Sequence, residues 1–392
     1  MKFKAPQALR HWAKATMAAG FLALAACSSG PNDTPAPATP SSEPVAVDPD
    51  PQPVTPTGEE KNRVAILVPL SGDNAAIGRS IANAAQMALI DTDESSIRLT
   101  LYDTAASGGA AAAANQALAD GNRLFLGPLR GENVGIVGPI ADRAGVPVIA
   151  YSNDESVAGD NVYIMGFMPT QSIDRVVDYA DSQGADVFAG IAPNGLYGQR
   201  TTQAFLRAVE RGGGRVARLE TYDRSTDSVT AAARRIAAVE DVDMILVADS
   251  GRIAQIAAPS LQLSGDLIGT ELWASDNDLG RVAGMRGSVF AAVPERMFGQ
   301  FAGRYRSRFD TSPYRLASLG YDSMLLVVRL ARQWDIGDAF PKDALTDRGG
   351  FQGVDGIFRF GRDNIAERSL EVRRVTASGT EVVSPASTSF DD

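Results

Sequence analysis

The sequence predicts an α/β fold built from two doubly wound lobes. Between residues 63 and 293, short apolar runs alternate with helical stretches, a pattern typical of βαβ units. The apolar runs are continuous rather than alternating, as expected for parallel strands buried on both faces of a sheet. The series restarts near residue 173, and a body of roughly 320 residues is too long for one small core. Two helical stretches follow the second series, which indicates that the lobes exchange segments.

The first series begins with the apolar run Val64–Val68, which ends at Pro69 and Gly72. A helix follows because Ile81, Ala84, Ala85, Ala88 and Leu89 recur at the spacing of one helical face. In chain order, we expect strands at 64–68, 97–102, 124–126 and 146–149, and helices around 81–89, at 106–119 and at 133–144.

The second series has the same alternation, and Gly212-Gly213-Gly214 ends its longest helix. We expect helices at 173–183, 197–211, 229–239 and 253–263, and strands at 187–192, 216–222, 244–248, 267–273 and 289–293. Two more helices are expected at 298–309 and 316–334. The last strands, 356–360 and 370–375, alternate with period two, as half-exposed strands do.

The first 26 residues predict a secretory signal peptide. A basic start precedes an apolar run that is shorter than the ~20 residues needed to span a bilayer. Leu24-Ala25-Ala26-Cys27 resembles the lipobox of bacterial lipoproteins, which implies that Cys27 becomes the acylated first residue. The alternative is an ordinary signal peptide with a chance Cys. Ser28 fits sorting to the outer membrane, so we expect a lipid anchor at its periplasmic face.

The composition excludes most catalytic chemistries. Cys27 is the only Cys and His11 the only His, so the mature chain would have neither a free thiol nor an imidazole. We therefore expect no enzyme, no cofactor and no metal site. The predicted signal peptide holds four of the 37 Lys and Arg and none of the 47 Asp and Glu, so its removal changes the net charge from −10 to −14. Such an acidic surface repels nucleic acid, and the acyl chains should provide the membrane contact.

The chain after the signal peptide is expected to have three parts. Residues 27–62 form a tether, because nine prolines lie between Pro31 and Pro56 and no apolar periodicity is present. Residues 63–385 form the body, and 386–392 a short tail. The tether is either a passive spacer or a device that lets the body reach a partner across the cell-wall layer.

Ligand clefts in doubly wound folds lie at the carboxyl ends of parallel strands and between lobes. Small and polar residues follow several predicted strands, and their exposed helix-start N–H groups suit an anion. The alternative is that these residues only make turns and caps. The candidate cleft residues are Ser71, Gly72, Gly127, Arg130, Tyr151, Ser152, Asn153, Tyr197, Ser250 and Asp276.

Several motifs occur in the order found in one family. These are residues 63–72 (RVAILVPLSG), Gly127-Pro128, 144–149 (AGVPVI), Tyr197-Gly198, 320–322 (GYD) and 351–356 (FQGVDG). Together they resemble the type I periplasmic binding proteins, which include the leucine/isoleucine/valine receptors of ABC importers. The resemblance implies two lobes joined by three crossovers, near Phe167, Val293 and Ala344. The first lobe would comprise about 63–167 and 294–344, and the second about 168–293 and 345–385.

The amino-acid site of these receptors is not reproduced here. Where the family places Ser residues that bind a substrate carboxylate, this chain has Leu129-Arg130-Gly131. After the fourth strand it has Asn153-Asp154-Glu155, whose two carboxylates would repel such a substrate unless Arg130 or a cation compensates. Tyr197 matches the receptors' Tyr before Gly, and Asp276 lies near their amine-binding acid.

A closer resemblance is to the lipoproteins named penicillin-binding protein activators. It rests on 74–85 (NAAIGRSIANAA), 101–104 (LYDT), 151–154 (YSND) and 166–169 (GFMP). It implies a lipid-anchored binding-protein fold that contacts a bifunctional peptidoglycan synthase, a penicillin-binding protein. We therefore expect an outer-membrane lipoprotein that regulates peptidoglycan synthesis. The alternative is a periplasmic solute receptor of an ABC importer, and the sequence does not decide whether the cleft binds a small molecule.

Overall fold

The computed structural model describes residues 60–261 and 264–390, and residues 58–392 form one compact unit. The predicted signal peptide, Cys27 and the tether up to residue 59 lie outside the described residues. Asn62, which the sequence analysis assigned to the tether, is the first residue of the first strand. No helix within 60–261 and 264–390 is long and apolar enough to cross a membrane.

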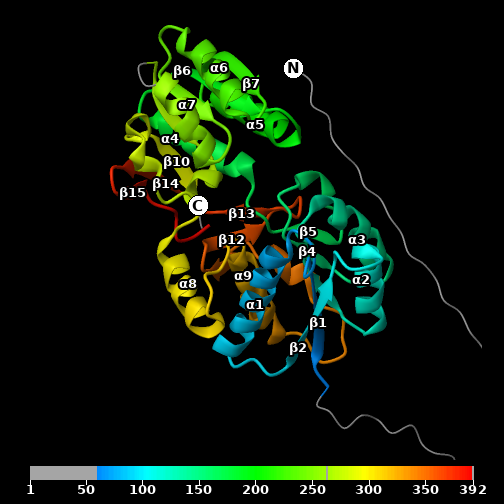
Figure 1. Cartoon of the computed structure of the whole chain (residues 1–392). Coiled ribbons are helices and arrows are strands. Elements are labelled where there is room, and N and C mark those ends of the chain that lie inside the picture. Colours follow the sequence, from blue (N-terminus) through cyan, green and yellow to red (C-terminus); the bar gives the residue numbers. More distant parts are fainter. Residues whose placement is uncertain (1–59, 262–263, 391–392) are drawn as a thin grey trace, which may run out of the picture. The chain divides into compact units, whose positions relative to one another are not determined.

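A parallel five-stranded sheet forms the centre of the first lobe, with strand order β2-β1-β3-β4-β5 (Figure 1). Its strands are β1 (Asn62–Val68), β2 (Ile97–Asp103), β3 (Leu124–Leu126), β4 (Val148–Ala150) and β5 (Val162–Ile164). Their registers are parallel throughout, for example Val64 opposite Leu99 and Leu124. The sequence analysis missed β5, which has three residues.

Helices cover both faces of this sheet, as the continuous apolar runs predict. Ile66 and the other even-numbered apolar residues of β1 pack with α1 (Ala75–Asp91) and α9 (Ala317–Ala331). Leu67 and Ala65 pack on the other face with α2 (Gly109–Ala119) and α3 (Gly131–Arg143). α9 reaches the first lobe from far along the sequence, which confirms the expected segment exchange. Phe301 and Tyr305 of α8 (Arg296–Phe309) also belong to the first core.

The second lobe has a seven-stranded sheet with strand order β15-β14-β10-β9-β8-β6-β7. The strands are β6 (Val187–Pro193), β7 (Arg215–Tyr222), β8 (Met244–Val247), β9 (Asp266–Gly269), β10 (Val289–Ala292), β14 (Glu371–Thr376) and β15 (Gly379–Ser384). β6 to β10 pair in parallel, whereas β14 and β15 are antiparallel additions at one edge.

Helices also cover both faces of the second sheet. Phe188 and Leu246 pack against α4 (Pro169–Ser182) and α5 (Leu196–Arg211). Ile191 and Ile245 pack against α6 (Thr226–Ala237) and α7 (Gly251–Leu261). All four apolar cores lie within this compact unit, so each lobe has its own buried core on both faces of its sheet.

One expected strand is shorter than its apolar run. β9 ends at Gly269, and Glu271–Ser275 form the short 3-10 helix η2 instead of continuing the strand to Trp273. A Cβ at Gly269 would lie 2.2 Å from the Trp273 ring, so the glycine lets this buried indole fold back onto the strand. The other 3-10 turns are η1 (Glu155–Val157), η3 (Leu279–Arg281), η4 (Ala283–Met285) and η5 (Lys342–Thr346).

The third crossover lies later than the sequence analysis placed it. A small antiparallel sheet, β11 (Phe351–Gly353), β12 (Gly356–Phe360) and β13 (Ala366–Arg368), packs on the first lobe's core beside α9 (Figure 1). The chain therefore returns to the second lobe at residues 369–370 and not near Ala344. Period-two alternation indicates a strand but not the core that it joins, and here the buried Phe351 and Phe358 join the first core.

Candidate functional site

A cavity of about 330 Å³ lies between the lobes. Its walls come from loops of both lobes and from all three crossovers, and most of the lining side chains are apolar. The first lobe contributes Leu129, Tyr151, Asn153, Arg315, Leu316 and Arg368, and the second lobe and crossovers contribute Phe167, Met168, Gln171, Ser172, Glu271, Leu272, Ala274, Ser275, Ala292, Val293 and Leu370.

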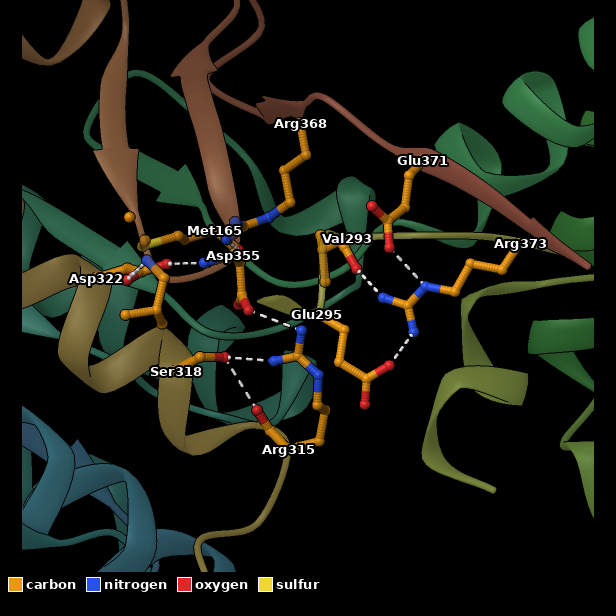
Figure 2. A network of polar contacts seen from close by, with 12 residues as sticks. Met165, Val293, Glu295, Arg315, Ser318, Asp322, Asp355, Arg368, Glu371 and Arg373 are labelled. Atoms are coloured by element: carbon orange, nitrogen blue, oxygen red, sulfur yellow. Dashed lines mark hydrogen bonds and ion pairs between the residues drawn. The ribbon is translucent and has the colours of Figure 1, made fainter. Parts of the chain in front are cut away.

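Arg315 is one of two arginines in the cavity wall. Its guanidinium donates to the Asp355 carboxylate at 2.7 Å and to the Ser318 hydroxyl at 2.9 Å (Figure 2). It also lies over two aromatic rings, 4.0 Å from the centroid of Phe298 and 5.3 Å from that of Phe167. These contacts fix Arg315 with its charge partly compensated.

Arg368 is the second arginine and is almost fully buried, with 8% of its surface exposed. Its Nη2 donates to the Met165 carbonyl at 2.8 Å, and the guanidinium lies near the rings of Phe167 and Phe358, 5.0 and 5.2 Å from their centroids (Figure 2). Within the described residues, its Nε and Nη1 have no hydrogen-bond partner. Burial lowers the pKa of Arg368, although Asp355 and Asp322 nearby oppose the shift.

Asp322 and Asp355 lie close to these arginines. Asp322 accepts from the backbone N–H groups of Val354 at 2.7 Å and Asp355 at 3.3 Å. Burial raises the pKa of Asp322 to about 7, and the charge of Asp355 adds to the shift. Gly353 makes this approach possible, because a Cβ there would lie 2.3 Å from the Asp322 carboxylate.

Glu271 contributes an acid to the cavity wall from the second lobe. It lies on η2 of the second lobe, and its Oε2 accepts from the Ser172 hydroxyl at 2.5 Å. Burial raises the pKa of Glu271 to about 7, against the effect of that hydrogen bond. The carboxyl group is therefore partly protonated near neutral pH.

The structure brings some of the predicted cleft residues together. Tyr151 and Asn153 line the cavity, and the Tyr151 hydroxyl is 2.8 Å from the Ser323 hydroxyl. A second, more open hollow of about 420 Å³ adjoins it at the edge of the cleft. Of the predicted residues, this hollow is lined by Arg130, Ser152, Asn153 and Tyr197.

The remaining predicted residues lie elsewhere. Asp276 lines a separate hollow of about 320 Å³ in the second lobe, together with Glu295 and Arg373. Ser71, Gly72, Gly127 and Ser250 are not among the lining residues of these three hollows. Gly127 has a structural role, because a Cβ there would lie 2.2 Å from the Leu67 carbonyl oxygen.

The sequence analysis considered Arg130 as the group that compensates Asp154 and Glu155, but the structure pairs these charged residues differently. Asp154 of the first lobe forms an ion pair at 2.5 Å with Arg200 of α5 in the second lobe. Arg130 instead pairs with Glu132 at 2.7 Å, so it does not compensate Asp154. Burial alone would raise the pKa of Asp154, but hydrogen bonds from Ser156 and Arg200 outweigh it and lower that pKa.

Sequence reasoning missed Arg315, Arg368 and Glu271 as cavity residues. Asp322 and Asp355 fall in two motifs of the family resemblance, so a signal was present, but no residue pattern indicated their arginine neighbours. Among the described residues, no group of three or more His, Cys, Asp or Glu could hold a metal ion.

The sequence pattern of the family described as periplasmic binding protein matches residues 61–380. This chain belongs to the periplasmic binding protein family. Family membership implies a periplasmic location. A solved structure of a putative branched-chain amino acid ABC transporter protein from Rhodospirillum rubrum has the same fold, with a TM-score of 0.71 and 19% identity over 82% of this chain and 100% of that one.

Two curated relatives match part of this periplasmic binding protein. An uncharacterized protein of Rickettsia prowazekii is 24% identical over 184 residues, which cover 47% of this chain and 49% of the relative. The penicillin-binding protein activator LpoA of Photobacterium profundum is 26% identical over 165 residues, 41% of this chain and 27% of the relative. The chain thus spans about half of the first relative and about a quarter of the second.

Proposed function

We propose that this protein is a lipid-anchored, non-enzymatic regulator of peptidoglycan synthesis that binds a penicillin-binding protein. Cys27 would anchor it at the periplasmic face of the outer membrane, and the tether would give the body its reach. The resemblance of residues 74–85 and 151–154 to penicillin-binding protein activators supports the proposal. So does the similarity to the Photobacterium profundum activator.

The ion pair between Asp154 and Arg200 is the observation that carries the proposal. Asp154 stands in the loop after β4, where the amino-acid receptors are expected to hold a substrate carboxylate, and Arg200 pairs with it from α5. There the protein's own charges, rather than those of a substrate, join the lobes. A body closed in this way is suited to present a fixed surface to a protein partner, since pre-organised surfaces lose less freedom on binding.

A surface patch for the partner should be about 800 Å² in area, with aromatic or Arg anchors near its centre. On α8, Tyr305 is buried in the core and Phe309 packs against it, whereas Arg306 and Arg308 are exposed. The aromatic residues of this helix therefore stabilise the fold, and its arginines are the groups available to a partner.

Reconstitution tests the proposal directly. The soluble body, residues 60–392, should bind a bifunctional synthase from the same cell and change its glycan-polymerising or cross-linking rate. The proposal fails if the body changes neither rate for any synthase of its own cell and binds none of them. A matched body with Arg306→Glu and Arg308→Glu tests whether α8 contributes.

The alternative function is that of a solute receptor for an ABC importer. The cavity between the lobes favours it, as does the fold shared with the Rhodospirillum rubrum protein. In that case deletion of the gene should abolish uptake of one solute and leave the synthase rates unchanged.

A further inference from the structure

We propose that an arginine-lined hollow on the first lobe binds the chain's own acidic residues Asp391 and Asp392, so that the C-terminal segment links the two lobes. The two acids lie outside the described residues. The inference goes beyond the proposed function, because it concerns the arrangement of the body and not the synthase. The open hollow has a volume of about 900 Å³ and is lined by Thr346, Arg348, Arg359, Phe360, Gly361, Arg362, Asp363 and Glu367.

After β15 the described chain passes from the second lobe to the first. Val383 packs against a core of the second lobe, and the Ser384 hydroxyl accepts a hydrogen bond from Arg175 of α4. Residues 385–390 then run to the small sheet of the first lobe, where Phe390 lies against Arg359 of β12 (Figure 1). This segment is a fourth passage between the lobes, in addition to the three crossovers.

Phe390 is the anchor of this segment on the first lobe. Its ring is half-buried, and its centroid lies 4.5 Å from the Arg359 guanidinium carbon. A Cβ at Gly350 would lie 3.1 Å from Cδ2 of Phe390, so the glycine lets the ring pack directly on the backbone. Stacking of a cation on an aromatic ring and apolar burial both stabilise this contact. Because Arg359 also lines the hollow, Phe390 marks the place where the described chain ends beside it.

The length of the chain keeps Asp391 and Asp392 near this hollow. An extended residue spans at most ~3.6 Å, so the two acids extend no more than about 7 Å beyond Phe390. A docked neighbour also gives the following charges a high effective concentration at the site. The two carboxylates are therefore presented to the hollow whether or not a free acid would bind there.

The charges of the hollow favour these acids. Glu367 already pairs with Arg359 at 2.7 Å, and Asp363 accepts a backbone N–H at 3.1 Å. Arg348 and Arg362 are exposed, and they take part in none of the ion pairs within residues 60–261 and 264–390. Two cations thus remain for two carboxylates. An exposed ion pair usually contributes little, but here Phe390 has already reduced the entropy cost of holding the partners together.

Distances between spin labels on the full chain test the docking. Cys27 is the only Cys, so Cys27→Ala removes every other thiol. Ser389→Cys and Asn115→Cys, at exposed positions of the segment and of α2, carry the labels. Double electron–electron resonance should show one narrow distance distribution. Arg348→Glu combined with Arg362→Glu should broaden it to a width on the order of 10 Å, the spread of a flexible chain as long as residues 385–389.

Charge reversal identifies the occupant of the hollow. Asp391→Arg combined with Asp392→Arg should broaden the distribution by itself and should restore the narrow one in the chain with both glutamate substitutions. Arg306→Glu with Arg308→Glu, the same charge change on α8, is the matched control and should leave the distribution narrow. Salt at about 1 M should broaden the distribution of the unsubstituted pairs, because it screens exposed charges beyond ~3 Å.

A second label pair reports on the lobes. Asn115→Cys is combined with Ala231→Cys, at an exposed position of α6 in the second lobe. If the segment links the lobes, its release by Arg348→Glu and Arg362→Glu should broaden this distribution too. An unchanged distance between the lobes after release overturns the link.

The other results decide the docking itself. A segment distribution that is broad in the unsubstituted chain, or that stays narrow after charge reversal in the hollow, contradicts the proposal. Broadening that the two arginine substitutions do not reverse shows that Asp391 and Asp392 are not the occupants. If the chain with both glutamate substitutions does not fold, Asp391→Asn with Asp392→Asn decides the question, since it alters no described residue. No synthase takes part in these measurements, so their failure leaves the regulatory proposal standing, and the reverse also holds.

Discussion

The carboxylate of Asp154 and the guanidinium of Arg200 lie 2.5 Å apart and join the two lobes at the edge of the cleft. About a fifth of the Asp154 side chain and a quarter of the Arg200 side chain are exposed, so solvent screens the pair only in part. Ser156 donates a further hydrogen bond to Asp154 and holds the carboxylate in place. The pair therefore favours the observed arrangement of the lobes.

Removal of this ion pair should loosen the cleft. We expect Asp154→Asn to speed amide hydrogen exchange in residues 129–133 and 196–200 and to lower the free energy of unfolding by about 1 kcal/mol. Arg211→Gln is the matched control, since Arg211 lies on the same helix and makes only exposed ion pairs with Asp174 and Asp178. Unchanged exchange in Asp154→Asn would show that the pair does not hold the lobes together.

The membrane contact should depend on one residue. Cys27→Ala should move the protein from the membrane fraction to the soluble periplasmic fraction, because acyl chains contribute ~0.8 kcal/mol per buried CH₂. Fractionation after a salt wash, with Ser28→Ala as the control, measures this. A Cys27→Ala protein that stays in the membrane pellet would contradict the anchor.

Gly353 should tolerate no side chain. A Cβ there would lie 2.3 Å from the Asp322 carboxylate, so Gly353→Ala must displace a buried, hydrogen-bonded acid. We expect a loss of about 2–4 kcal/mol in the free energy of unfolding, measured by urea titration. Gly303→Ala, within α8 and with no atom near its Cβ, is the control and should be stabilising by up to ~1 kcal/mol. Equal effects of the two substitutions would refute this account.

The stability of the body should fall as the pH rises toward neutrality. Burial raises the pKa of Glu271 from 4.5 to about 7, so the folded state holds this proton more tightly than the unfolded state. The resulting stabilisation is fully present below about pH 4.5 and is lost as the pH rises through about 7. Glu271→Gln should therefore reduce the fall in unfolding free energy between about pH 5 and 8, by on the order of 2 kcal/mol.

The pH dependence of stability has a matched control variant, and a second buried acid also contributes to it. Glu132→Gln, at an exposed position, should leave the pH dependence as it is in the wild type. Asp322 has a raised pKa as well, so part of the dependence should persist in Glu271→Gln. If Glu271→Gln left the whole slope unchanged, the buried carboxyl of Glu271 would not be its source.

Local sequence patterns predicted most of the secondary structure. The apolar runs of β1 and β6 and the periodic faces of α1 and α5 are visible in the sequence because burial on one or both sides selects residues at a fixed spacing. The strands β5, β11 and β13 were missed, whereas the equally short β3 and β4 were predicted because each forms a continuous apolar run beside a Gly or Pro. Of the predicted cleft residues, Tyr151 and Asn153 line the cavity, since both follow a strand at its carboxyl end.

By itself, the sequence determined the α/β class, the two series of βα units and the family to which the chain belongs. These depend on spacing between neighbours in the chain and on the order of motifs along it. Only the tertiary structure decided that β11 to β13 join the first core, that Arg200 and not Arg130 pairs with Asp154, and that Arg368 lines the cavity. Those contacts join side chains from separate elements, Asp154 and Arg200 being 46 positions apart. Their partners are selected by the way the lobes and crossovers pack, because burial and charge pairing act through space and not along the chain.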